Sequence, residues 1–100
     1  MPTLHLHLRD GFVGERVVVR AGDQVLLDEA DVRTRPQLGL ALACEVEVPH
    51  GPLALQVAVP SRGLARALTV EATRTPWVGV SVDGDGALSV VATPDAFGYV

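Results

Sequence analysis

Apolar and polar residues alternate along most of the chain with a period of two. The clearest example is Leu-His-Leu-His-Leu at residues 4–8, and a second is Val-Gly-Val-Ser-Val at residues 78–82. Successive side chains of a strand point to opposite faces of a sheet, so this pattern predicts strands with one buried face. The other positions that we expect to face the core are Val17, Val19, Leu40, Leu42, Cys44, Val46, Val48, Leu53, Leu55, Val57, Val59, Leu68, Val70, Leu88 and Val90.

Turn-forming residues separate these segments. Residues 21–24 (Ala-Gly-Asp-Gln) predict a hairpin, and residues 49–52 (Pro-His-Gly-Pro) end one strand and begin the next. A further turn is expected at residues 61–63. Asp-Gly-Asp-Gly at residues 83–86 favours a tight hairpin turn, because Asp and Gly tolerate the positive φ angles of a type I′ turn.

Short strands separated by turn signals roughly every 8–12 residues are typical of an all-β fold. We therefore predict a single-domain antiparallel β-sandwich of about seven to eight strands over residues 1–100, with no helix. The stretch Asp28–Leu38 is the least strand-like, because it combines five charged residues with Pro36. We expect it to cross from one sheet to the other.

Composition excludes several function classes. The chain has no Lys, so mechanisms that use a lysine Schiff base or a P-loop are excluded. The formal net charge is −4, and there is no basic run, so we expect no nucleic-acid partner and no adsorption to anionic membranes. The longest apolar stretch, Leu38–Cys44, is far shorter than the roughly 20 residues of a membrane-spanning helix.

The single cysteine, Cys44, cannot form an intramolecular disulfide. No secretory leader is visible at the N-terminus, because a basic segment followed by an apolar one is missing there. Both observations predict a cytoplasmic location. Cys44 lies in the inward phase, where burial raises the pKa of a thiol and makes it unreactive.

Residues 46–53 give a strand, a Pro-Gly turn and a strand, followed by Gly63, Leu68–Glu71 and Val78–Val82. This layout resembles bacterial prealbumin-like or immunoglobulin-like β-sandwich modules. The resemblance is architectural and covers Val46 to Val82. It implies an accessory or binding domain without catalytic activity.

His5 and His7 are the most specific chemical feature. Alternation places both imidazoles on one face of a strand, roughly 6.5–7 Å apart, a spacing that lets two rings bind one transition-metal ion. His50 is the remaining histidine, and Glu45 or Glu47 could supply an oxygen ligand. The other interpretation is a pair of solvated histidines on an outer sheet face.

Other arrangements do not indicate catalysis or a calcium site. Asp83 and Asp85 begin like a calcium loop, but the twelfth position counted from Asp83 is Pro94 instead of the required Glu. Glu45 and Glu47 lie on one face of one strand, whereas glycoside hydrolysis needs two carboxylates across a cleft. No serine lies in a nucleophile elbow. We therefore expect no enzymatic activity and no cofactor, with a metal ion at His5 and His7 as the alternative.

Two features indicate association. Outward-facing alanines on neighbouring strands would form a flat face suited to self-association, although alanine also suits neutral surface positions. The tail containing Phe97 and Tyr99 either folds back to cap the chain's own core or docks on a partner. We predict a binding or assembly module that forms a homo-oligomer or binds a protein partner, through the alanine face or an edge strand. The interface candidates are Ala41, Ala43, Ala54, Ala58, Phe97 and Tyr99.

Overall fold

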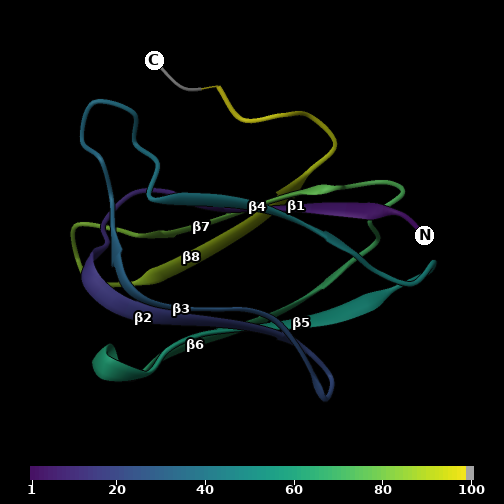
Figure 1. Cartoon of the computed structure of the whole chain (residues 1–100), viewed down its shortest axis with the longest axis horizontal. Coiled ribbons are helices and arrows are strands. Elements are labelled where there is room, and N and C mark those ends of the chain that lie inside the picture. Colours follow the sequence, from purple (N-terminus) through teal and green to yellow (C-terminus); the bar gives the residue numbers. More distant parts are fainter. Residues whose placement is uncertain (99–100) are drawn as a thin grey trace.

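The computed structural model describes residues 1–98, which form two layers of strands (Figure 1). These residues contain a single short 3-10 helix, and no helix long and apolar enough to cross a bilayer. The elements in chain order are β1 (Thr3–Leu8), β2 (Val13–Ala21), β3 (Gln24–Arg33), β4 (Leu42–Glu47), β5 (Leu53–Val59), η1 (Pro60–Arg62), β6 (Leu64–Val70), β7 (Trp77–Val82) and β8 (Leu88–Thr93). The all-β fold and the number of strands agree with the sequence-based prediction.

The strands form two four-stranded sheets, with the orders β4-β1-β7-β8 and β3-β2-β5-β6 (Figure 1). Five of the neighbouring pairs are antiparallel, whereas β1 and β7 are parallel. The expectation of a purely antiparallel fold is therefore wrong at this one pair. Parallel neighbours need a long connection, and here all the strands from β2 to β6 lie between them in sequence.

Inward-facing side chains of both sheets form one hydrophobic cluster. Leu4, Leu6 and Leu8 of β1 are completely buried, and β4 contributes half-buried side chains. The predicted period of two is therefore confirmed, and full burial of each such side chain stabilises the fold by about 1.5–3 kcal/mol. Phe12, which directly precedes β2 and is not among the predicted inward positions, is also buried.

Two connections differ from their predictions. β3 continues to Arg33, so the crossing between the sheets is made by residues 34–41 and not by all of Asp28–Leu38. The charged residues of β3 fit a strand because β3 lies at the edge of its sheet, where Arg16 holds Asp28 through two hydrogen bonds of 2.8 and 2.7 Å. Residue 31 has a φ of 54°, beside irregular pairing with β2.

The β7–β8 connection is longer than a two-residue type I′ turn. The Asp83 carboxylate accepts hydrogen bonds from the amides of Asp85 and Ala87, at 2.9 and 3.0 Å. Among these residues only Gly86 has a positive φ. The position of the hairpin is confirmed, and its predicted turn type is wrong because the carboxylate of Asp83 organises a wider loop.

One ion pair joins β2 to η1. The Glu15 side chain is only 7% exposed, and its Oε2 lies 2.7 Å from Nε of Arg62. Its Oε1 accepts a hydrogen bond from the Val13 amide. A buried carboxylate is costly without such partners, so Arg62 fixes the turn between β5 and β6 against β2.

We expect Arg62→Ala to lower the free energy of unfolding by about 2 kcal/mol, because it leaves the buried Glu15 carboxylate without its cation. Urea denaturation measures the change. Arg74→Ala is the matched control, because Arg74 pairs with Glu71 at 3.5 Å while 82% exposed. Equal effects of the two variants would contradict this role of Glu15.

Candidate functional site

The outer face of the β4-β1-β7-β8 sheet carries His5, His7 and two of the three aromatic side chains of the described residues, Trp77 and Phe97. In register across the sheet, His5 lies between Glu45 on β4 and Trp77 on β7. The His5 and Trp77 rings stack, with centroids 4.0 Å apart and an interplanar angle of 8°. On the other side of His5, its Nδ1 lies 3.4 Å from Oε1 of Glu45. The prediction that His5 and His7 share an outer face is confirmed.

Phe97 packs on the same face. His7 lies between Ala43 and Gly79, and the Phe97 ring covers the space that a side chain at Gly79 would fill. The Phe97 centroid is 5.5 Å from His7 and 6.4 Å from Trp77. The guanidinium carbon of Arg9 lies 4.5 Å from that centroid. We call His5, His7, Trp77 and Phe97 the aromatic face.

The described part of the tail therefore folds back onto its own chain, which is one of the two interpretations of the sequence. Its Phe97 covers the outside of a sheet, however, and does not cap the hydrophobic core. The ring lies above Gly79, and this side of β7 is the outer face of the sheet. Tyr99 lies outside the described residues.

A hollow of about 490 Å³ adjoins the aromatic face on its β4 side. It is lined by His5, His7, Trp77, Ala43, Cys44 and Glu45. One carboxylate and two imidazoles surround it, and the small side chain of Ala43 leaves it space. Such a surface combines flat ring contacts with a few hydrogen-bonding groups, which is the usual composition of a small binding site.

The histidines do not converge with further ligands. The described residues contain no group of three or more His, Cys, Asp or Glu side chains that could hold a metal ion. His50 is exposed in the β4–β5 connection, and the His5 ring is occupied by its stack on Trp77 and its contact with Glu45. Of the suggested ligands, only Glu45 is brought beside a histidine.

Cys44 is half-buried and packs against the core from β4. Burial raises the pKa of its thiol, and the negative charge of Glu29 raises it further. Both effects disfavour the thiolate, which is the nucleophilic form. The prediction of an inward and unreactive cysteine agrees with this environment.

The structure separates the predicted alanines into two groups. Ala43 is exposed on the aromatic face, and Ala41 is half-buried before β4, where its amide donates to the Leu8 carbonyl. Ala54 and Ala58 lie on β5, in the other sheet. Alanines of different sheets cannot form one continuous outer face, so any alanine face involves one group alone.

The four edge strands differ in charge. β3 and β4 carry several acidic residues, and β6 carries Arg66, whereas β8 reads Leu-Ser-Val-Val-Ala-Thr. Nε of Arg66 donates a 3.1 Å hydrogen bond to the Leu88 carbonyl, at the start of β8. Val91 in the middle of β8 is 46% exposed. Among the edges of the described structure, β8 is therefore the one without charged side chains.

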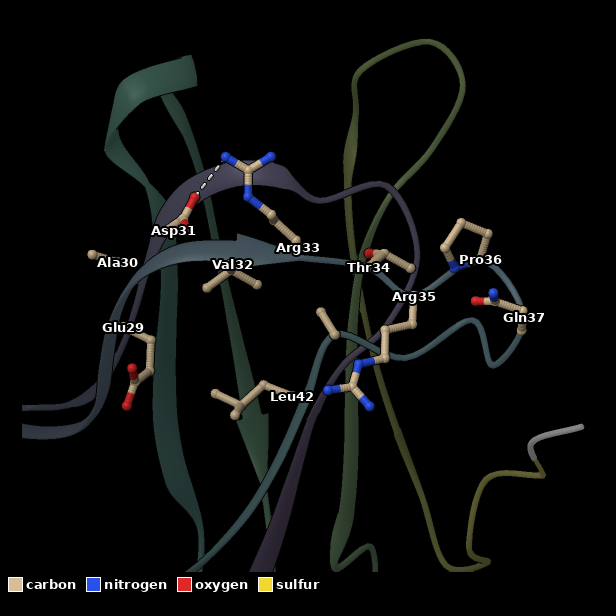
Figure 2. Close-up of a pocket in the computed structure, with 11 residues that line it drawn as sticks. Glu29, Ala30, Asp31, Val32, Arg33, Thr34, Arg35, Pro36, Gln37 and Leu42 are labelled. Carbon is tan, nitrogen blue, oxygen red and sulfur yellow. Dashed lines mark ion pairs between the residues drawn. The ribbon is translucent and has the colours of Figure 1, made fainter.

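Another hollow, of about 440 Å³, lies between β3 and the connection to β4 (Figure 2). Figure 2 shows Asp31 and Arg33 turned toward each other on one side of β3, with Glu29, Leu42 and Arg35 on the other side. Oδ1 of Asp31 is 2.8 Å from Nη2 of Arg33, and both side chains are largely exposed. Asp31 and Arg33 thus neutralise each other at the rim of this hollow.

Sequence reasoning did not assign a role to Trp77, Gly79 or Arg9. The available signal was the period of two, which placed Trp77 and Gly79 on an outward-facing phase of their strand. A large aromatic side chain in an outward position marks a contact surface, and a glycine inside a strand marks a close approach. The residue that approaches Gly79 is Phe97, and the spacing of the sequence does not predict this contact.

Comparison of the chain with protein-family models, curated proteins and solved structures finds no significant match.

The pKa of His7 is lowered from its ordinary value of 6.5, chiefly because burial disfavours the charged ring, and further by the positive charges of His5 and Arg9. The unfolded chain therefore binds a proton at His7 at a higher pH than the folded chain does. We expect the free energy of unfolding to fall as pH decreases below about 6.5, down to the lowered pKa. NMR titration of the His7 ring should give a midpoint below 6.5.

Urea denaturation between pH 7 and 5 tests the effect on stability. His7→Gln should give a shallower decrease than the wild-type chain, because it removes the titrating ring. His50→Gln is the control for the loss of an exposed imidazole. A His7 midpoint at or above 6.5 would show that the ring is more solvated than its position on the aromatic face indicates.

Proposed function

We propose that this protein is a non-catalytic binding and assembly module, a β-sandwich that self-associates by pairing β8 with β8 of a second copy. The observation that carries the proposal is the uncharged edge of β8. An exposed edge presents unpaired amides and carbonyls, which another strand can pair with. Charged side chains or prolines usually protect such an edge, and β8 has neither within Leu88–Thr93.

The backbone direction of β8 supports this edge. The Leu88 carbonyl points away from β7, since it accepts from Arg66. Alternate residues of a strand direct their amides and carbonyls to the same side, so those of Val90 and Ala92 also face away from β7. β6 approaches β8 near Leu88 without pairing with it. The later part of β8 is therefore available to a second strand.

The β3 and β4 edges suit self-pairing less well. β4 carries Glu45 and Glu47, which would repel their copies in a pair of identical strands. β3 is charged and irregularly paired, and a positive φ at Asp31 interrupts its regular geometry. Both features are common protections of edge strands.

The sheet orders differ from those of an immunoglobulin constant-type sandwich, which leaves the prealbumin-like form of the architectural resemblance. An immunoglobulin constant-type sandwich places its first strand beside its second, whereas β1 here lies between β4 and β7. The resemblance implies an accessory or binding domain without catalytic activity, and we propose no cofactor for it. A cytoplasmic setting fits the single, half-buried Cys44.

Sedimentation velocity over a range of concentrations tests this proposal, and we expect the wild-type chain to form a dimer. The double variant Ser89→Lys/Val91→Lys should raise the dissociation constant at least tenfold, or about 1.4 kcal/mol. The new lysines lie on the exposed side of β8 and would face like charges across a β8–β8 pair.

Ala54→Lys/Ala67→Lys is the matched control, because it adds the same charge at exposed positions of β5 and β6. It should leave the dissociation constant unchanged. A wild-type chain that stays monomeric at high concentration would overturn the proposal. Loss of the dimer in the control alone would locate the interface on the alanines of the other sheet.

A further inference from the structure

The Phe97 ring lies above Gly79 and is contacted from several sides. A Cβ at Gly79 would lie 2.8 Å from Cζ of Phe97, so the ring rests on the bare backbone of β7. Trp77 meets the ring edge-to-face at 87°, and His7 lies beside it at 53°. The Arg9 guanidinium lies over the ring. We call His7, Arg9, Trp77 and Gly79 the cradle.

Within residues 94–98, the part of the tail that the structure describes, Phe97 is the side chain with ring contacts to the sheet. After β8 the chain rises away from the β4-β1-β7-β8 layer (Figure 1), and Pro94, Asp95, Ala96 and Gly98 are all exposed. Phe97 is the half-buried residue among them. An anchor of one ring on a short exposed segment can be exchanged for another ring without disturbing the core.

We propose that the cradle is a binding site for an aromatic side chain of a peptide, which the chain's own Phe97 occupies in the structure described here. A cation over the ring face and an edge-to-face indole are specific to aromatic rings, because both interactions depend on the ring quadrupole. An aliphatic side chain would gain contact area only. The cradle lies on the outer face of the sheet beside β8, where Gly79 is in register with Val91, whereas the proposed self-association uses the backbone edge of β8. The inference therefore goes beyond the proposed self-association.

Gly79 supports this assignment because its backbone does not require glycine. It is not among the residues with a positive φ, and glycine in the interior of a strand weakens the strand. A side chain at this position would instead occupy the space that the Phe97 ring fills. It would also crowd Arg9, whose Cδ lies 3.1 Å from the built Cβ. The glycine thus keeps the cradle open.

Fluorescence tests the proposal directly, since Trp77 is the only tryptophan of the chain. Full-length Phe97→Ala vacates the cradle. The probe is a capped synthetic peptide with the sequence of residues 94–98, Pro-Asp-Ala-Phe-Gly. We expect a saturable change in Trp77 emission with Phe97→Ala, and at least tenfold weaker binding to the wild-type chain, where the attached ring competes.

The same peptide with Ala in place of Phe should cause no saturable change. Adding Gly79→Ala to Phe97→Ala should weaken binding of the Phe peptide at least tenfold, because the new methyl group fills the cradle. The proposal is overturned if Phe97→Ala binds neither peptide, if it binds both equally, or if Gly79→Ala has no effect on binding.

A stability cycle gives a second readout that needs no peptide. Gly79→Ala should lower the midpoint of urea denaturation in the wild-type chain and not in Phe97→Ala, where no ring is displaced. Gly84→Ala, at a site with nothing within 4 Å of the built Cβ, controls for a general glycine effect. Equal losses with and without Phe97 would contradict the cradle. Sedimentation of the same samples reports self-association separately, so either proposal can fail alone.

Discussion

The two faces of β1 are the constraint on which the rest of the structure depends. Its three leucines are completely buried in the cluster that joins the two sheets, and its two histidines lie on the opposite face. Because β1 is a central strand between β4 and β7, the core fixes the register of both neighbours. That register sets Glu45 and Trp77 on either side of His5. The packing of the interior therefore determines which side chains meet on the surface.

Much of the fold followed from local pattern. Alternation located the strands and most inward-facing residues, since burial of one face repeats every second residue in any sheet. It could not determine which strands become neighbours, and the parallel pairing of β1 with β7 depends on contacts between opposite ends of the chain. The sequence does not predict the end of β3 at Arg33 for a different reason. Its charged residues indicate a loop by composition, whereas an edge strand tolerates them because their side chains reach solvent.

The candidate surfaces were predictable only in part. His5 and His7 lie on one strand, so their shared face could be inferred from spacing. Their actual neighbours, Trp77 and Phe97, come from distant segments, and this aromatic contact was not foreseen. The alanines show the opposite case. Each outward position was reasonable alone, but Ala43 and Ala54 belong to different sheets, which only the strand order reveals.

The two sheets approach each other more closely along one side of the molecule than along the other. On one side β6 approaches β8, and Arg66 bridges the strands through the Leu88 carbonyl. On the other side a hollow lies between β3 and the connection to β4, and the residues of β4 that face the core are half-buried there. Segments with less buried apolar surface open at lower free energy than the rest of a fold. Local opening should therefore begin at β4, none of whose side chains is fully buried, and amide hydrogens of β4 should exchange before those of β7.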